Sequence, residues 1–303
     1  MTMTERMTAV RRCIAIGECM VELAPAQDGL YRLGYAGDTF NTAWYLQASL
    51  AAGEVCYASA IGTDAASAKL RSFVADSGIT PALQEVPETS VGLYLIETKD
   101  GERSFSYWRS ASAARQLAAD PYRLPVAGQG DLLFFSGITM AILLGQGRQN
   151  LLAYLSAARD RGAIVVFDPN LRPRLWQSGD DMRHWITEAA RVSDVVLPSH
   201  EDEAEHFGDA DPAVTGARYQ ALGCGVVIVK DGPGAVRILT PEGVEEVSPQ
   251  KVTQLVDTTA AGDAFNAGML AAWIGGAELA TSVAAGCALS ARVIQAPGAL
   301  VQL

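Results

Sequence analysis

Cysteine and histidine are scarce in this 303-residue chain, and their scarcity argues against two kinds of protein. The five cysteines, at positions 13, 19, 56, 224 and 287, include no C-x-x-C pair. Small secreted domains that depend on disulfides use an even and regularly spaced set instead. The three histidines, at 184, 200 and 206, lack the spacing of a zinc site. We therefore expect buried, reduced cysteines and a cytoplasmic location.

Positive charge and long apolar runs are also in short supply. Lys and Arg number 23 against 34 Asp and Glu, which gives a formal net charge of −11. An acidic chain is poorly suited to nucleic-acid backbones and anionic membranes. The most apolar stretches, 264–277 and 279–291, are each shorter than the ~18 residues that a membrane span needs. The first twelve residues have no apolar core of the secretory type. We expect neither a nucleic-acid nor a membrane partner.

Three common catalytic motifs are missing. The chain has no G-x-x-x-x-G-K-[ST] and no G-x-S-x-G, which counts against a P-loop kinase and a serine hydrolase. After the first apolar run Gly17 stands alone, without the G-x-G-x-x-G of a nicotinamide dehydrogenase. No repeat or Pro/Ser-rich linker divides the chain, and 49% of its residues are hydrophobic. One domain over 1–303 is the simplest organisation.

Apolar strand-like runs alternate with helical patterns along most of the chain. This alternation predicts an α/β fold, with a mostly parallel sheet covered by helices. A hairpin is expected over 235–240 and 244–247. Residues 13–23 are expected to begin with a first strand that is followed by a turn at Gly17. The other expected strands are 54–61, 131–135, 163–167, 194–197 and 226–229, and the expected helices are 39–50, 64–77, 146–161, 180–191, 201–207, 213–222, 261–274 and 279–294.

The pattern changes in the second quarter of the chain. The β-prone runs 91–98 and 102–108 alternate apolar and polar residues and are joined by Lys99-Asp100-Gly101, a plausible hairpin turn. A hairpin with one polar face does not fit a buried parallel sheet. We therefore expect a small β lid, formed by roughly 30–36 and 80–110.

The most informative segment is Asp257-Thr258-Thr259-Ala260-Ala261-Gly262-Asp263, at the start of an expected helix. The small residues at 260–262 leave the first backbone N–H groups of the helix open to an anion, such as a transferring phosphoryl group. A carboxylate in the first turn, Asp263, suits the general base that accepts a hydroxyl proton. Helix capping alone would explain the aspartate but not the whole run.

This run resembles the C-terminal signature D-T-x-[GA]-A-G-D of the ribokinase-like (PfkB-type) carbohydrate kinases. Their N-terminal signature, G-G-x-x-x-N-x-A, is matched by Ala36–Ala43, with Ala36 in place of the first Gly. The two motifs occur in the family's order about 220 residues apart, so the resemblance covers nearly the whole chain. It implies a three-layer α/β/α sandwich with a small β-sheet lid over the sugar. D-T-T-A-A-G-D is most similar to the 2-keto-3-deoxygluconate kinases of the family.

The resemblance also implies substrate contacts. The Y-x-R run at Tyr107 and Arg109, with Tyr94 opposite, is similar to the segment that binds the acid group in the 2-keto-3-deoxygluconate kinases. Planar Arg suits a carboxylate, although a solvated Arg at a strand end is the commoner case. Asp168-Pro169-Asn170-Leu171-Arg172 is similar to the D-x-N-x-R run of the sugar-acid and fructose kinases. The expected substrate-binding residues are Gly37, Asp38, Asn41, Tyr94, Tyr107, Arg109 and Arg172.

The nucleotide side is less sharply marked. Lys230-Asp231-Gly232-Pro233-Gly234 resembles the family's K-x-G-x-x-G loop, with a shorter spacing, and a plain tight turn explains the glycines equally well. Pro198-Ser199-His200-Glu201-Asp202 is similar to the P-N-x-x-E run, which orders Mg²⁺ through water. The expected nucleotide-binding residues are Asn170, Ser199, Lys230, Gly232 and Gly234; the expected cation contacts are Asp202 for Mg²⁺ through water and Asp257 and Thr259 for a monovalent cation such as K⁺.

The sequence thus predicts ATP- and Mg²⁺-dependent phosphorylation of 2-keto-3-deoxy-D-gluconate to its 6-phosphate, with Asp263 as the base and Ala260, Ala261 and Gly262 around the phosphoryl group. One alternative is a fructokinase- or ribokinase-like enzyme acting on a neutral sugar, which would leave Tyr107 and Arg109 without a partner. Another is a non-catalytic module that binds sugar or nucleotide, which the intact Asp263 disfavours. A homodimer through the lid is the expected assembly.

Overall fold

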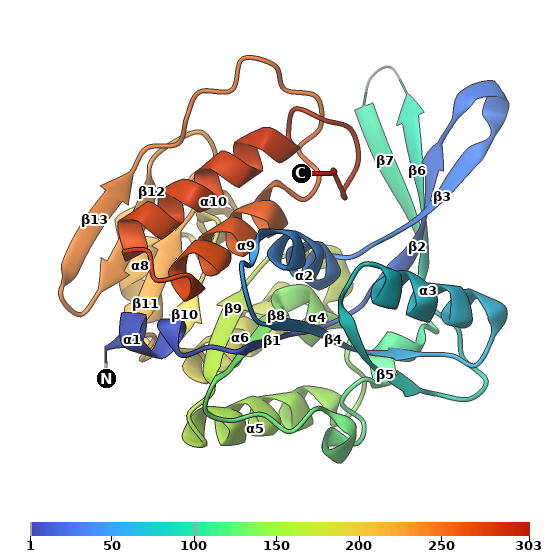
Figure 1. Cartoon of the computed structure of the whole chain (residues 1–303), viewed down its shortest axis with the longest axis horizontal. Coiled ribbons are helices and arrows are strands. Elements are labelled where there is room, and N and C mark those ends of the chain that lie inside the picture. Colours follow the sequence, from blue (N-terminus) through green and yellow to red (C-terminus); the bar gives the residue numbers. More distant parts are fainter. Residues whose placement is uncertain (1, 100–101) are drawn as a thin grey trace.

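Residues 2–99 and 102–303, which the computed structural model describes, contain a central sheet of nine strands (Figure 1). From edge to edge the strand order is β13-β12-β11-β10-β9-β8-β1-β4-β5. The strands from β11 to β5 run parallel, and β12 and β13 form the antiparallel hairpin that the sequence predicts. The strands are β1 (Arg12–Ile16), β4 (Glu54–Ile61), β5 (Thr80–Glu85), β8 (Asp131–Ser136), β9 (Ile164–Asp168), β10 (Val195–Val196), β11 (Val226–Val229), β12 (Val236–Thr240) and β13 (Gly243–Val247).

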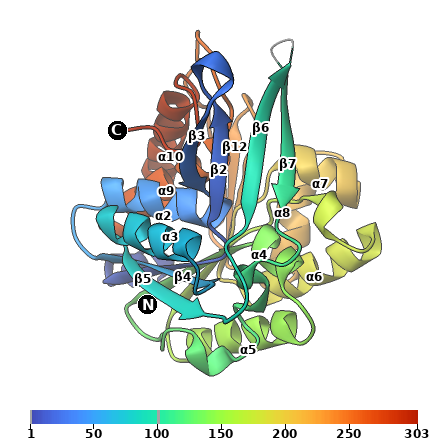
Figure 2. The ribbon, with the colours of Figure 1, turned by 90° about the vertical axis from the view of Figure 1, so that its right-hand side faces the viewer.

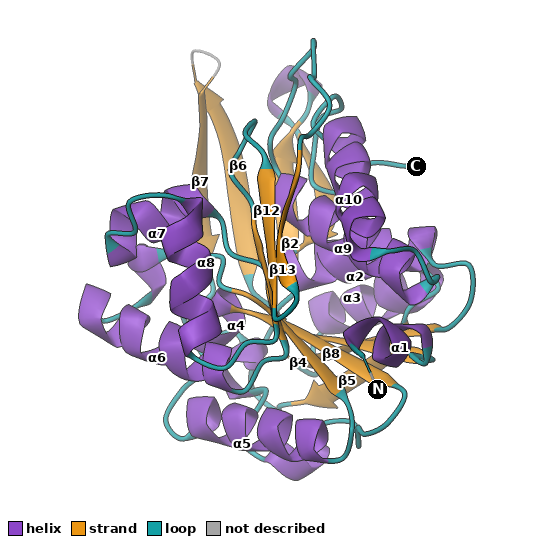
Figure 3. Ribbon diagram, turned by 90° about the vertical axis from the view of Figure 1, so that its left-hand side faces the viewer, coloured by secondary structure: helices purple, strands orange, loops and turns teal. Residues whose placement is uncertain are grey.

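Helices cover both faces of this sheet (Figure 3). Successive side chains of a strand point to opposite faces. Accordingly, Cys13 and Ala15 of β1 pack into one apolar core and Ile14 and Ile16 into the other. The α/β/α expectation is therefore confirmed. One layer holds α1 (Met3–Thr8), α2 (Asp38–Ser49), α3 (Ala65–Asp76), α9 (Ala261–Ile274) and α10 (Leu279–Val293); the other holds α4 (Gly137–Ile142), α5 (Gly147–Asp160), α6 (Gly179–Arg191), α7 (His200–Phe207) and α8 (Pro212–Ala221).

A smaller sheet projects from the body as the lid (Figures 1 and 2). Its strand order is β3-β2-β6-β7, and β2 and β6 are its parallel pair. The expected Lys99-Asp100-Gly101 turn lies largely outside the described residues, which stop at 99 and resume at 102. The lid strands are β2 (Met20–Pro25), β3 (Tyr31–Ala36), β6 (Leu93–Lys99) and β7 (Glu102–Trp108).

The lid differs from the expected segments 30–36 and 80–110 in two places. Residues 80–85 form β5, which pairs with β4 at the edge of the large sheet. Conversely, residues 20–25, which lie outside the expected lid segments, form the lid strand β2. The expected turn at Gly17 follows β1, and a Cβ atom there would lie 2.3 Å from Thr39 Oγ1.

Candidate active site

A cleft of ≈ 490 Å³ lies between the lid and the carboxyl ends of the parallel strands. Open α/β sheets commonly bind ligands at this edge, because the loops there converge. Within the described chain, the lining omits three of the predicted site residues: Gly232, Gly234 and Asp257. The predicted residues that line the cleft are Gly37, Asp38, Asn41, Tyr94, Tyr107, Arg109, Asn170, Arg172, Ser199, Asp202, Lys230, Thr259, Ala260, Ala261, Gly262 and Asp263.

Asp263 lies in the first turn of α9 and is buried at the cleft. Asn41 of α2 donates from Nδ2 to Asp263 Oδ2 at 2.8 Å, and the backbone N–H of Gly37 donates to Asn41 Oδ1 at 3.3 Å. The two signature motifs thus meet here although they lie 222 residues apart. Burial raises the pKa of Asp263 well above its usual range, and the charge of Asp38 adds to this effect. Such a carboxylate, once ionised, is a stronger base than a solvated one.

Ala260 precedes α9 in the left-handed conformation, with φ 61° and ψ 16°. This conformation costs a residue with a Cβ roughly 1 kcal/mol, so glycine, which the D-T-x-[GA]-A-G-D signature also allows at this position, would adopt it more readily. The first amide to join the helix is that of Ala264, which donates to the Ala260 carbonyl at 2.9 Å. One detail differs from the expected anion hole, because the Ala261 amide donates to the Thr258 carbonyl at 3.2 Å.

A group of three polar residues that motif matching did not assign to catalysis lies beside Asp263. Asn266 donates to Asp168 Oδ2 at 2.6 Å, and Lys230 Nζ lies 3.2 Å from the same oxygen. A Cβ added at Gly262 would be 3.8 Å from Lys230 Nζ, so the ammonium group lies next to the start of α9. Asn266 follows Asp263 by three residues, a spacing that places both on one helix face and that the sequence already contained.

Asn170, which is expected to bind nucleotide, contacts Asp38, one of the residues expected to bind substrate. Its Nδ2 donates to Asp38 Oδ2 at 2.9 Å. Asn170 has a φ of 37°, a conformation that asparagine tolerates better than most residues. Burial raises the pKa of Asp38, and hydrogen bonds from Ser136 and Asn170 oppose that shift. Asn170 therefore orients Asp38, while both residues still line the cleft.

Two residues predicted to bind an acid group already interact with glutamates of the chain. Arg109 Nη2 is paired with Glu18 Oε2, and the Tyr94 hydroxyl donates to Glu22 Oε2. Burial and the charge of Glu22 raise the pKa of Tyr94, so this phenol keeps its proton. The cationic character of Arg109 is consequently matched within the protein, contrary to the expectation that a neutral sugar would leave it unpaired. Neither glutamate belongs to a motif, and Glu18 is marked only by its place after a strand end.

Arg172 and Asp202 both line the cleft and form an ion pair, with 3.6 Å between Arg172 Nη1 and Asp202 Oδ2. Burial raises the pKa of Asp202, and the charge of Arg172 opposes the shift. Ser199 pairs with Lys230 in an isolated parallel bridge, which joins the start of α7 to the end of β11. The structure thus identifies Asp202, rather than Glu201 or Glu203, as the carboxylate of this segment that lines the cleft.

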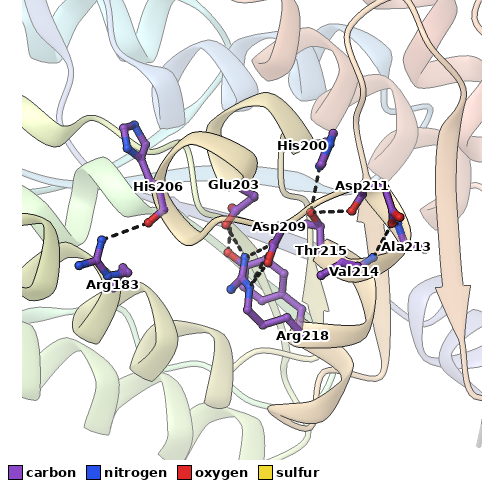
Figure 4. Close-up of polar contacts among 11 residues, drawn as sticks. Arg183, His200, Glu203, His206, Asp209, Asp211, Ala213, Val214, Thr215 and Arg218 are labelled. Atoms are coloured by element: carbon purple, nitrogen blue, oxygen red, sulfur yellow. Dashed lines mark hydrogen bonds and ion pairs between the residues drawn. The ribbon is translucent and has the colours of Figure 1, made fainter.

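The opposite side of α7 is fixed to α8 by buried charges (Figure 4). Glu203 accepts hydrogen bonds from Arg218 at 2.6 Å and from the Tyr219 hydroxyl at 2.9 Å. Arg218 also contacts both carboxylate oxygens of Asp209, and its guanidinium lies 3.9 Å from the Phe207 ring centroid. Adjacent residues of one helix, Asp202 and Glu203, therefore face the cleft and a buried ion-pair network.

The remaining predicted residues lie outside the cleft lining. Gly232 has a φ of 51° and belongs to the turn between β11 and β12, in which the Gly234 amide donates to the Asp231 carbonyl at 2.7 Å. Asp257 accepts hydrogen bonds from the Thr259 hydroxyl at 2.7 Å and the Gly298 amide at 2.6 Å. Asp257 thereby connects the segment before α9 to the segment after α10.

Comparison with known proteins identifies what this arrangement resembles. The model of the pfkB family of carbohydrate kinases matches residues 10–302. The 2-dehydro-3-deoxygluconokinase of Dickeya dadantii (strain 3937) is 36% identical over 298 residues, which cover 95% of this chain and 96% of the relative.

Solved structures agree on the fold. Aminoimidazole riboside kinase from Salmonella enterica, complexed with aminoimidazole riboside and an ATP analogue, superposes with a TM-score of 0.83 at 24% identity, covering 95% of this chain and 94% of that one. Fructokinase from Vibrio cholerae O395, with fructose, ADP and calcium ion bound, gives a TM-score of 0.84 at 23% identity, covering 96% of this chain and 95% of that one. Among the described helices, none is both long and apolar enough to cross a bilayer.

Proposed function

The chain belongs to the pfkB family of carbohydrate kinases, and from this premise we propose that it transfers the γ-phosphoryl group of ATP to 2-keto-3-deoxy-D-gluconate, giving the 6-phosphate. The observation that carries the substrate assignment is the 36% identity, over 95% of the chain, to a 2-dehydro-3-deoxygluconokinase. The protein is a sugar kinase, a phosphotransferase with an alcohol group as acceptor.

The geometry supports Asp263 as the general base. Asn41 occupies Oδ2 of its carboxylate, which leaves Oδ1 to accept the proton of the acceptor hydroxyl. Lys230 contributes positive charge next to the start of α9, where the amides of Gly262 and Asp263 precede the first helical hydrogen bond. Negative charge that develops on the transferring phosphoryl group is stabilised by such preorganised donors.

The charge balance of the cleft fits nucleotide bound together with a cation. Its lining holds five carboxylates, from Glu18, Asp38, Asp168, Asp202 and Asp263, and three cationic side chains, from Arg109, Arg172 and Lys230. A hard divalent ion such as Mg²⁺ prefers oxygen ligands and keeps several waters when it binds phosphates. Asp202 supplies carboxylate oxygens and lines the cleft. We therefore propose that it contacts, through water, the Mg²⁺ that accompanies ATP.

The segment around Asp257 and Thr259 is our proposed location for a monovalent cation such as K⁺. Both oxygens of the Asp257 carboxylate accept hydrogen bonds from the chain, which holds two loops together. Asp257 thereby shapes the loops that would hold the cation. Gly232 and Gly234 belong to the outer nucleotide-binding loop in this proposal.

The direct experiment is to measure ADP release from MgATP with 2-keto-3-deoxygluconate, fructose or ribose as acceptor. We expect turnover with the keto-deoxy acid and a kcat loss of about 10²–10⁴-fold in Asp263→Asn, the usual contribution of a general base. Asp160→Asn, at an exposed helix end, serves as the matched control and should keep wild-type kcat. Preference for fructose or ribose would reject the sugar acid as substrate, and full activity of Asp263→Asn would reject Asp263 as the general base.

A further inference from the structure

The guanidinium of Arg109 is paired with the buried carboxylate of Glu18. Glu18 is 3% exposed, and Arg109 is its hydrogen-bond partner in the described part of the chain. The side chain of Arg109 is itself only 13% exposed, yet it lines the cleft. Removing a charged pair from water costs desolvation free energy, so this buried pair differs from an ordinary salt bridge on the protein surface.

The two members of the pair come from different parts of the molecule. Glu18 directly follows β1 and Gly17, at the carboxyl edge of the central sheet. Arg109 directly follows β7, at the base of the lid hairpin. Backbone packing leaves Glu18 little freedom, because a Cβ at Gly37 would lie 2.1 Å from its carbonyl oxygen. The ion pair therefore fixes a lid-borne arginine to the rigid sheet.

The contact also leaves hydrogen-bonding capacity on the arginine. Glu18 accepts from Nη2 through Oε2, and the side chain of Arg109 also lines the cleft. A guanidinium carries five N–H donors in a rigid plane, so fixing one edge orients the others. A carboxylate bound by an oriented guanidinium is recognised by direction as well as by charge.

We propose that Glu18 is the positioning residue for acid recognition: its buried carboxylate fixes Arg109 to the end of β1, so that the remaining donors of Arg109 face the carboxylate of the acceptor. This inference rests on the proposed function, in which Arg109 contacts the acid group of 2-keto-3-deoxygluconate. Glu18 touches no substrate in this scheme and acts through Arg109 alone.

The test compares 2-keto-3-deoxygluconate with its carboxamide, which has the same shape but no acid charge. For Glu18→Ala we expect the KM for the acid to rise about tenfold, in keeping with the loss of one charge-assisted hydrogen bond, while kcat and the KM for ATP stay within about twofold. The preference for acid over carboxamide, as a ratio of kcat/KM, should fall by a similar factor. Glu18→Gln keeps an acceptor for Arg109, so its KM for the acid and its acid preference should lie between those of the wild type and Glu18→Ala.

Two further variants separate the possible outcomes. Glu203→Ala removes another buried glutamate paired with an arginine, away from the cleft, and should lower Tm without changing the acid preference. If Arg109→Met leaves that preference intact, acid recognition by Arg109 itself is rejected. If Arg109→Met lowers the preference but Glu18→Ala and Glu18→Gln do not, only the positioning role is rejected. An equal rise in the KM for ATP and for the sugar acid would also overturn it, because that pattern indicates a general structural role.

Discussion

At the scale of single residues, the site gathers carboxylates that would repel one another if all were ionised. Asp263 lies near Asp38 and Asp168, and both neighbours contribute to raising its pKa. Hydrogen bonds offset part of this repulsion, from Asn41 to Asp263 and from Asn170 to Asp38. Each carboxylate thus has its own amide partner. Raised carboxylate pKa values are common in the clefts of functional sites, and buried ion-pair networks such as that of Glu203 raise them as well.

This environment predicts the pH dependence of kcat. The base must be ionised to accept a proton, and its folded pKa is raised, so kcat should fall on the acid side at a pH above the ordinary aspartate range of about 3.9. Replacing the neighbour, Asp38→Asn, removes a like charge and should move this acid limb to lower pH, whatever its effect on KM. The measurement is kcat at saturating substrate from pH 4 to 9, with Asp160→Asn as the unshifted control. An acid limb that stays in place in Asp38→Asn would contradict this assignment.

At the scale of helices and strands, sequence pattern predicted the body of the fold well. The expected strand over 54–61 and the expected helix over 261–274 match β4 and α9 residue for residue. The short helices α1 and α4 were not predicted. Each has six residues, and a hydrophobic pattern with a period of 3.6 needs a longer segment to be recognised. The place of β2 in the lid was not predicted for a different reason. It depends on pairing with β3 and β6, which are tertiary contacts.

In the site, too, features marked by sequence motifs were predicted, and features that depend on tertiary contacts were not. The two signature motifs predicted that Asp263 and Asn41 belong to one site, and the hydrogen bond between their side chains shows that they meet. The residues that hold other predicted side chains of the site in place were not predictable in this way. Glu18 and Glu22 meet Arg109 and Tyr94 from distant segments, and no spacing in the chain reports such meetings. The structure also adds a contact that the motif did not indicate, the hydrogen bond from Asn170 to Asp38.

The contact between α7 and α8 gives a stability prediction. Burial raises the pKa of Glu203 from 4.5 to about 7, against the opposing charge of Arg218. The folded state thus favours protonated Glu203, so its contribution to stability is fully present below about pH 4.5 and is lost as pH rises through about 7. Relative to wild type, Glu203→Gln should therefore gain stability between these pH values, by roughly 3 kcal/mol from a shift of this size.

Urea unfolding at pH 4.5, 6 and 8 measures this difference. Glu205→Gln, in the same helix, is the control, because the Glu205 side chain is 72% exposed and should show no comparable trend. A difference between Glu203→Gln and wild type that is constant across these pH values would show that Glu203 titrates normally in the folded protein.

At the scale of the whole molecule, the lid has two unlike faces. Residues opposite one another in register share a face of a sheet. Tyr94 lies opposite Glu22 and Tyr107, which places these side chains on the face toward the cleft. The other face carries Leu23 opposite both Leu33 and Leu95. Leu33 is 53% exposed, and Trp108, whose register partner is Leu93, is 58% exposed. An apolar face on a projecting four-stranded sheet is a liability unless something covers it.

We propose that a second copy of the chain covers this face, forming a homodimer through the two lids. Leu33→Glu should then convert the dimer to a monomer in sedimentation-velocity experiments, because the apolar face would bury an unpaired charge on each side of the symmetry axis. Val244→Glu is the matched control. Val244 is also a strand residue with 53% of its surface exposed, but it lies in β13 at the far edge of the large sheet. A wild-type chain that sediments as a monomer at micromolar concentration would reject the lid dimer, and dissociation by Val244→Glu alone would move the interface to β13.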